Sequence, residues 1–279
     1  LHGSLLRRFT QIYPSDEAYD GLIERLVKIE HMRLMFGKKA VNIWLASKKK
    51  RVVLKERVVF DPTQSVDPET HINLFRGLAI EPSTEGQCDK LIELLHYLCG
   101  ESPEDTETPV TSWVMRWLAY PLQNVGAKMH TAIVMHGDPG AGKNLFFKAI
   151  GEIYGDHSVV ISNMQLESQF NDWLSAKLFL VANEVVARRE LRHQVGYLLN
   201  LITEPEIWIN PKQIGGRYEA NHANLVFFSN ELEPLHVSPK DRRYMVIKTP
   251  GPREKAYYDA IVTELRAGGA AALLQYLRD

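Results

Sequence analysis

The chain has 279 residues, of which 45% are hydrophobic and 24% are charged, and its net charge is −1. This length and composition suit one large domain or two modest ones with a buried core. No apolar run approaches the roughly 20 residues of a membrane span, and we expect no signal peptide. The two cysteines, Cys88 and Cys99, exclude a disulfide framework or a cysteine-rich metal cluster and favour a reducing, cytoplasmic setting. Because the first residue is Leu1 rather than Met, we expect a piece of a longer protein.

Charge is distributed unevenly along the chain. Between Arg33 and Arg57, nine Lys or Arg residues accompany a single acid, Glu56. Between Asp61 and Glu107, eleven acids accompany two bases. The basic block is either a solvated face or a contact for a polyanion, and both interpretations stay open at this point.

The first 110 residues predict a smaller, mainly helical amino-terminal region. Apolar residues at helical spacing indicate a helix over Glu17–Met35, and the strand-like run Val52–Phe60 follows the basic block. A second helix is expected over Asp89–Cys99, with Gly100 ending it. We therefore expect a helical, collar-like region over residues 1–110, a core over 111–252 and a carboxyl-terminal helix over 253–279.

From residue 111 onward, helices alternate with short apolar strands. The expected strands are Thr131–Met135, Ser158–Ile161, Lys177–Ala182, Glu206–Ile209, Asn224–Ser229 and Tyr244–Lys248. This alternation predicts an α/β fold in which a parallel sheet carries helices on its faces.

The segment between the first of these strands and the next helix is rich in glycine. It reads Gly137, Asp138, Pro139, Gly140, Ala141, Gly142, Lys143, Asn144 and Leu145. Such a strand, turn and helix form the phosphate-binding loop of a nucleotidase, in which backbone N–H groups and the helix N-terminus face a polyphosphate. Lys143 is expected on the β- and γ-phosphates, and Asn144 stands where a hydroxyl commonly binds Mg²⁺. The alternative is an ordinary glycine-rich turn before a helix.

Two polar residues follow the buried strand Lys177–Ala182. Glu184 has the position of the carboxylate that polarises the attacking water in phosphate-loop enzymes, and the alternative is an acid that starts a helix. Asn183 stands where relatives commonly carry an acid. We therefore expect a Mg²⁺ site made of Asn144, Asn183 and Glu184, with less ligand charge than usual.

Two later strands also lie next to polar residues that suit this chemistry. Asn230 follows the strand Asn224–Ser229 and could contact the γ-phosphate or position water, unless it only opens a turn. Arg242 and Arg243 precede the strand Tyr244–Lys248, where an arginine could reach the phosphates bound by a neighbouring subunit. Adjacent arginines taken alone are more often a surface feature.

This ordered set resembles the superfamily 3 helicases, and most closely the helicase module of D5-type primase-helicases from viruses, phages and mobile elements. The likeness extends to His71–Gly77, Trp117–Asn124 and Gln169–Trp173. It implies a modified AAA+ fold, a hexameric ring and ATP-driven 3′-to-5′ movement on single-stranded DNA. It also implies that Lys143 holds the phosphates and that Glu184 is the catalytic carboxylate. Asn230 would be the sensor, and Arg242 or, preferably, Arg243 the arginine finger.

The resemblance places a hairpin, Trp208–Tyr218, in the channel of that ring. Lys212 would contact the DNA backbone, Arg217 is a second candidate, and Tyr218 could stack on a base. The alternative is an ordinary exposed hairpin.

We therefore expect the ATP- and Mg²⁺-dependent motor of a replicative DNA helicase that acts on single-stranded or forked DNA. We also expect a primase-polymerase domain in the same polypeptide. The protein would belong to a phage, plasmid or mobile element and act in its host cell. Two alternatives remain: a phosphate-loop ATPase that is not a helicase, and a nucleotide-binding ring that serves as an assembly module for a primase-polymerase. The two asparagines at the metal positions keep the second alternative open.

Overall fold

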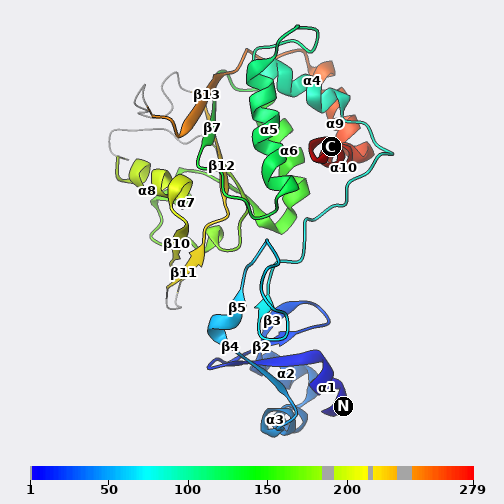
Figure 1. Ribbon diagram of the computed structural model, residues 1–279, viewed down its shortest axis with the longest axis vertical. Coiled ribbons are helices and arrows are strands. Elements are labelled where there is room, and N and C mark those ends of the chain that lie inside the picture. Colours follow the sequence, from blue (N-terminus) through cyan, green and yellow to red (C-terminus); the bar gives the residue numbers. More distant parts are fainter. Residues whose placement is uncertain (1, 184–191, 213–215, 231–240) are drawn as a thin grey trace. The chain divides into compact units, whose positions relative to one another are not determined.

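The computed structural model describes residues 2–183, 192–212, 216–230 and 241–279 (Figure 1). Its contacts divide the chain into two compact units, Leu1–Gly77 and Leu78–Asp279. The division therefore falls well before residue 110, where the sequence predicted it. Helix α4 (Asp89–Leu98) belongs to the second unit because its apolar face, including the fully buried Leu91 and Leu94, packs against that unit's helices α6 and α9.

The first unit is a mixed α/β structure, so the prediction of a mainly helical region is wrong. Its sheet has the order β3-β2-β1-β4, with β1 and β4 parallel and the other pairs antiparallel. The strands are β1 (Phe9–Tyr13), β2 (Glu17–Asp20), β3 (Arg25–Lys28) and β4 (Arg51–Leu54). Helices α1 (His2–Arg8), α2 (Ile29–Phe36) and α3 (Lys38–Ala46) contribute to a core around Phe9, Met32 and Trp44. A short 3-10 helix, η1 (Lys55–Arg57), and the parallel pair β5 (Val58–Val59) and β6 (Ile72–Asn73) complete the unit.

The expected helix Glu17–Met35 divides into β2, a turn, β3 and α2. Leu22 and Ile23, which supplied part of its helical spacing, are 70% and 50% exposed in the turn. Asp20 ends β2 fully buried, and Arg8 donates to both of its carboxylate oxygens at 2.8 and 2.6 Å. Long-range pairing of this kind overrides local periodicity.

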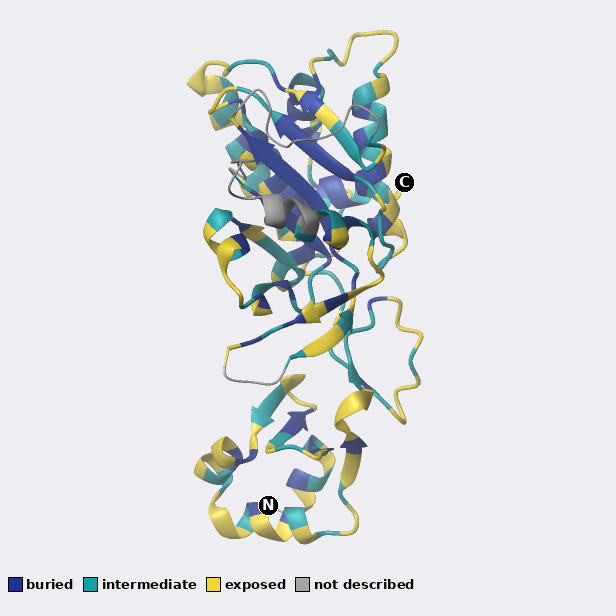
Figure 2. Ribbon diagram, turned by 90° about the vertical axis from the view of Figure 1, so that its left-hand side faces the viewer, coloured by how far each residue is buried: buried dark blue, intermediate teal, exposed yellow. Residues whose placement is uncertain are grey.

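The second unit is built on a five-stranded sheet in the order β13-β7-β12-β9-β8, and every neighbouring pair is parallel. Its strands are β7 (Ala132–His136), β8 (Ser158–Ile161), β9 (Phe179–Ala182), β12 (Asn224–Ser229) and β13 (Tyr244–Lys248). The three central strands, β7, β12 and β9, form the buried centre of the unit in Figure 2. This confirms the predicted α/β fold with a parallel sheet.

Helices cover both faces of this sheet. On one face, Phe147 of α6 (Lys143–Tyr154) stacks on Phe179 and contacts Phe228. On the other face, residues of α7 (Asn163–Glu167) and α8 (Arg192–Thr203) join a core with Leu180 and Phe227. Alternate residues of β12 therefore point to opposite faces, as in any strand. Helix α5 (Pro109–Gln123) and the carboxyl-terminal helix α10 (Ala270–Arg278) pack on one another, and α10 also packs on α6 (Figure 1).

The remaining elements are short or lie outside this sheet. Strands β10 (Glu206–Ile209) and β11 (Arg217–Ala220) form a separate antiparallel hairpin. The predicted carboxyl-terminal helix is two helices, α9 (Lys255–Glu264) and α10, joined by the π-turn η5 (Leu265–Gly269), in which Gly268 has a φ of +96°. Two 3-10 helices, η2 (Gly155–His157) and η3 (Asp172–Leu174), precede β8 and β9. No helix among the described residues is long and apolar enough to cross a membrane.

Candidate nucleotide and DNA site

The glycine-rich loop joins the carboxyl end of β7 to the first turn of α6. Gly137, Gly140 and Gly142 have φ values of +143°, +84° and +103°, a region that residues with a side chain rarely adopt. A Cβ atom on Gly137 would also lie 2.5 Å from the Thr249 Oγ1 atom. The carbonyl oxygen of Gly142 accepts hydrogen bonds from the Leu145 and Phe146 N–H groups at 3.0 and 3.1 Å, which starts α6. The strand, loop and helix predicted around residues 137–145 are therefore present.

Lys143 is buried at the centre of this loop, with only 6% of the residue exposed. Its Nζ atom donates to the carbonyl oxygens of Gly137 and Asp138 at 2.8 and 3.1 Å. Burial lowers the pKa of this ammonium, and the nearby Asp138 offsets part of that effect. Among the described residues, no carboxylate forms an ion pair with Lys143. A buried ammonium that is held only by backbone carbonyls suits an anionic ligand.

Asn230 follows a strand that ends beside this loop. Strand β12 lies next to β7, with Ser229 opposite His136, and the Gly137 N–H group donates to the Ser229 carbonyl oxygen at 3.2 Å. Asn230 is the next residue and is exposed. The structure thus brings the predicted sensor position to the edge of the phosphate loop, although its role stays a prediction.

The predicted metal ligands follow two strands, β7 and β9, which β12 separates. Asn144 is exposed on the first turn of α6, and Asn183 follows β9, with its N–H group donating to the Ile161 carbonyl oxygen at 2.7 Å. Glu184, the predicted catalytic carboxylate, lies outside the described residues. Within the described ranges, no group of three His, Cys, Asp or Glu side chains could hold a metal ion. Asn144 and Asn183 could offer only neutral amide oxygens to a hard cation such as Mg²⁺.

Arg243 lies at the amino ends of the strands, whereas the phosphate loop lies at their carboxyl ends. Its carbonyl oxygen accepts from the Ala132 N–H group at 2.8 Å, at the amino end of β7. Its guanidinium donates to both carboxylate oxygens of Asp241 at 2.8 and 2.7 Å, and this lowers the pKa of that carboxyl. Arg242 is exposed beside it. The five residues of β7, at about 3.3 Å each, separate the two ends of the strand. This separation is longer than an arginine side chain. Neither arginine can therefore reach the phosphate loop of its own chain.

The predicted DNA hairpin is present as β10 and β11, although residues 213–215 at its turn lie outside the described ranges. Trp208 and Tyr218 are paired across it, with ring centroids 4.9 Å apart and exposed fractions of 48% and 69%. Lys212 is exposed just after β10. Arg217 instead forms an ion pair with Glu219 at 2.5 Å, so part of its charge is already neutralised.

Trp208 was not predicted as a site residue, although the alternation in β10 contained the signal. Residues 206 to 209 alternate between exposed and buried, so a large aromatic side chain at 208 points outward. A Cβ atom on Gly216 would lie 2.2 Å from the Trp208 Cζ2 atom, which explains the glycine there.

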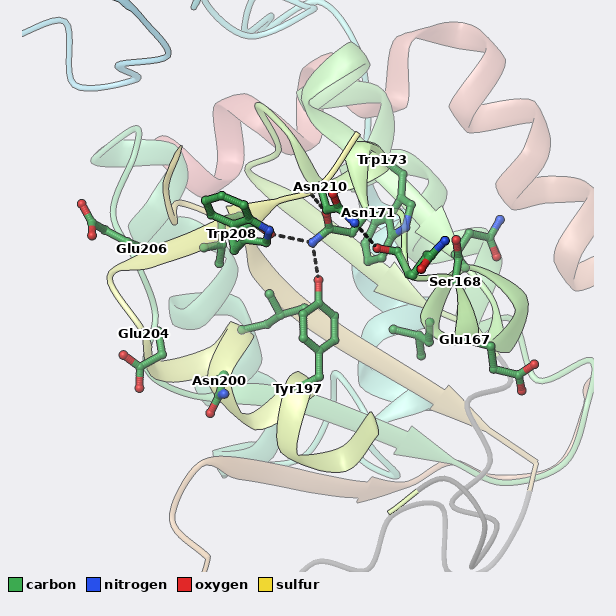
Figure 3. A pocket seen from close by; sticks show the side chains of 15 residues that line it. Glu167, Ser168, Asn171, Trp173, Tyr197, Asn200, Glu204, Glu206, Trp208 and Asn210 are labelled. Atoms are coloured by element: carbon green, nitrogen blue, oxygen red, sulfur yellow. Dashed lines mark hydrogen bonds between the residues drawn. The ribbon is translucent and has the colours of Figure 1, made fainter. Parts of the chain in front are cut away.

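A pocket of about 550 Å³ lies beside this hairpin (Figure 3). The buried Asn171 forms hydrogen bonds to other residues that line the pocket. The Nδ2 atom of Asn171 donates to the Tyr197 hydroxyl at 3.0 Å and to the Trp208 carbonyl at 2.8 Å. Its Oδ1 atom accepts from the Asn210 N–H group at 2.6 Å. Asn171, in the segment Gln169–Trp173, therefore fixes the end of β10.

The two cysteines take no part in this site. Burial raises the pKa of Cys88 to about 11 and that of Cys99 to about 12, so neither is a thiolate near neutral pH.

Sequence comparisons relate part of this chain to one family and to a phage protein. A family of unknown function, DUF5906, matches residues 135–243, a range that runs from the end of β7 to Arg243. The DNA primase-polymerase of Nitratiruptor phage NrS-1 is 34% identical over 137 residues, which is 48% of this chain and 19% of that protein. The chain thus spans about a fifth of that relative's length.

Solved structures of the C-terminal region of NrS-1 have the same fold. One apo structure has a TM-score of 0.79 at 21% identity and covers 99% of this chain and 68% of that one. An A-form apo structure gives 0.77 at the same identity and coverage. Because the match covers nearly all of this chain, it includes both units.

Proposed function

We propose that this chain is the ATP-driven motor of a phage-type replication protein, moving on single-stranded DNA as a helicase. The observation that carries the proposal is the phosphate loop at the carboxyl end of β7, with the buried Lys143 at its centre and Asn230 at its edge. Similarity to a phage DNA primase-polymerase supports a role in DNA replication. It also supports a primase-polymerase domain in the same polypeptide.

The strand order supports assignment of the core to the modified AAA+ class. In this order β12, which delivers Asn230, lies between β7 with the phosphate loop and β9 with Asn183 and Glu184 after it. Three groups suited to phosphate chemistry thus follow the carboxyl ends of three adjacent strands, where open α/β sheets bind ligands.

Each residue has a distinct task in the proposed reaction. Lys143 neutralises the β- and γ-phosphates, Glu184 orients and deprotonates water, and Asn230 contacts the γ-phosphate. Asn144 and Asn183, with Glu184, would hold Mg²⁺, which screens the phosphate oxygens when bound. Arg243 of one subunit would reach the phosphates of the next, which requires a ring, proposed as a hexamer.

The hairpin would grip the DNA backbone through Lys212. The exposed Trp208–Tyr218 pair is suited to stacking on bases without regard to sequence. Two other functions stay open. A phosphate-loop ATPase of another kind would share the loop, and an assembly module would bind nucleotide without turning it over.

ATP hydrolysis measured with and without single-stranded DNA separates the three functions. The motor predicts turnover that DNA increases and that Lys143→Ala abolishes. The exposed Lys148, on the same helix, is the matched control, and Lys148→Ala should leave the rate unchanged. An ATPase rate that single-stranded DNA does not change would favour another kind of ATPase. Nucleotide binding without hydrolysis would favour the assembly module.

A further inference from the structure

A short segment after β13 lies against the first half of the phosphate loop. We define residues Thr249–Arg253 as the strap. The Thr249 N–H group donates to the His136 carbonyl oxygen at 2.8 Å, just before the loop. Cβ atoms built on Gly140 and Gly251 would lie 3.5 Å from Pro252 Cβ and 3.6 Å from Asp138 Oδ2, respectively. The strap thus lies next to the loop at its start and its middle, between His136 and Gly140.

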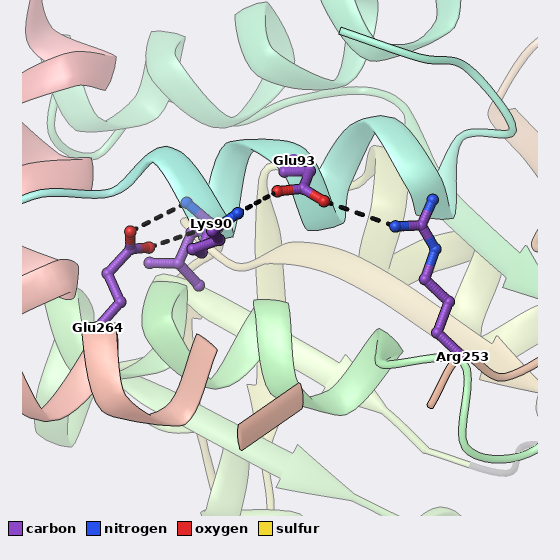
Figure 4. A network of polar contacts seen from close by, with 5 residues as sticks. Lys90, Glu93, Arg253 and Glu264 are labelled. Atoms are coloured by element: carbon purple, nitrogen blue, oxygen red, sulfur yellow. Dashed lines mark hydrogen bonds and ion pairs between the residues drawn. The ribbon is translucent and has the colours of Figure 1, made fainter. Parts of the chain in front are cut away.

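Arg253 holds the end of the strap through both its guanidinium and its backbone. Its guanidinium carbon lies 4.1 Å from the ring centroid of Tyr97 and 4.6 Å from that of Tyr257. Its Nη1 atom lies 3.5 Å from a Glu93 carboxylate oxygen (Figure 4), and its backbone N–H group donates to the Tyr258 hydroxyl at 2.9 Å. The Tyr97 hydroxyl also donates to the Gly251 carbonyl oxygen within the strap.

The helix that carries Tyr97 and Glu93 is itself fixed against the loop. Glu264 of α9 accepts from the Lys90 and Leu91 N–H groups at 2.9 Å each, so it caps the start of α4 (Figure 4). In the middle of α4, Leu94 lies 2.9 Å from a Cβ atom built on Gly142. The strap and α4 therefore neighbour different residues of the loop, and Arg253 joins the strap to α4.

We propose that Arg253 is a positioning residue for the phosphate loop. Three glycines in the left-handed region leave the loop backbone few side-chain contacts of its own, so its shape depends on what packs against it. Joining the strap to α4 holds the loop N–H groups ready for phosphate, and the effect of Arg253 is on nucleotide affinity. This role rests on the proposed ATP site.

Two measurements on the full chain test this role. The first is the Kd for ADP in Arg253→Ala, Arg253→Lys and the wild type. Arg253→Ala should raise Kd about tenfold, in the range expected for removal of stacked cation–π interactions. Arg253→Lys keeps the charge but loses the planar group and should lie between. The exposed Arg266 of η5 is the matched control, and Arg266→Ala should bind as the wild type does.

The second measurement is amide hydrogen exchange without nucleotide. Arg253→Ala should speed exchange of the loop amides over residues 137–142, while the amides of β8 keep their wild-type rates. Unchanged Kd and unchanged loop exchange in Arg253→Ala would overturn the role of Arg253 and leave the ATP site standing. A wild-type chain that binds no nucleotide would overturn the ATP site and, with it, the effect of Arg253 on nucleotide affinity. Equal acceleration of exchange in β8 and the loop would show general destabilisation and also overturn the positioning role.

Discussion

Lys143 and Arg243 lie at opposite ends of the same strand, β7. Lys143 follows the loop at its carboxyl end, whereas the Arg243 carbonyl oxygen accepts from Ala132 at its amino end. One subunit therefore cannot bring both residues to one phosphate. If both act on ATP, the arginine has to come from a neighbouring subunit.

The first prediction concerns that shared site. Glu184→Gln and Arg243→Ala should each lose turnover by about 10²-fold or more, in the range expected for loss of a general base or an arginine finger. Mixed assemblies of the two variants should recover part of the activity, because some interfaces then combine an intact Glu184 with an intact Arg243. ATPase rate against mixing ratio measures this.

The neighbouring arginine supplies the control. Arg242→Ala mixed with Glu184→Gln should behave as diluted wild type if Arg243 is the finger. No recovery at any ratio in confirmed mixed assemblies would remove Arg243 from the mechanism. To reach the phosphates of a neighbouring subunit, the Arg243 guanidinium has to break its ion pair with Asp241. Asp241→Asn removes the charge of that partner and should therefore not lower turnover.

The local parts of this site could be predicted from the sequence, because they depend on neighbouring residues. The strands around the loop and its three glycines have short-range signatures, and β12 and β13 were predicted with their observed bounds. The contacts of Arg253 could not be predicted, because Tyr97 is far away in the chain and a cation–π contact leaves no periodic pattern. The ion pair of Arg217 with Glu219 was missed, although residues two apart on a strand share a face and the sequence therefore contained this signal.

The second prediction concerns the metal. Asn144 and Asn183 supply neutral oxygens, and affinity for hard cations grows with ligand charge. Asn183→Asp should therefore lower the Mg²⁺ concentration that gives half-maximal ATPase. The exposed Asn200 of α8 offers a matched change, and Asn200→Asp should leave that concentration unchanged. Equal Mg²⁺ requirements in Asn183→Asp and wild type would place Asn183 away from the metal.

The third prediction compares two basic surfaces. Removing one side chain that binds a DNA phosphate should lower the salt slope of single-strand binding by about 0.7. Lys212→Ala, repeated around an assembly, should lower the slope by several times that amount and abolish unwinding, while basal ATPase survives. Arg217→Ala should have a smaller effect, because Glu219 already pairs with Arg217.

The alternative DNA site is the basic block of the first unit. Lys48, Lys49 and Lys50 follow α3, and Lys50 donates to the Leu45 carbonyl oxygen at 2.6 Å. Changing all three lysines to alanine should leave the salt slope of single-strand binding unchanged. If the triple variant loses DNA binding while Lys212→Ala unwinds normally, the DNA site belongs to the block.

The fourth prediction concerns pH and Lys128. Burial lowers the pKa of Lys128 to about 7, and its Nζ atom donates to the Leu201 carbonyl at 2.6 Å. Between pH 7 and its unfolded pKa of about 10.4, the native state binds fewer protons at this group than the unfolded state does, so stability rises with pH. The free energy of unfolding of wild type relative to Lys128→Met should therefore increase from about pH 7 to about pH 9.5. Denaturant unfolding at both pH values measures it, and a constant difference would contradict the lowered pKa.

Strand separation on forked DNA tests the central claim most directly. The assembled protein should release the displaced strand only with ATP and Mg²⁺. Lys143→Ala should abolish release because it removes the ammonium from the phosphate loop, and Lys148→Ala should not. ATP hydrolysis without any strand release on forks with either a 3′ or a 5′ single-stranded arm, or release that persists in Lys143→Ala, would contradict an ATP-driven helicase motor.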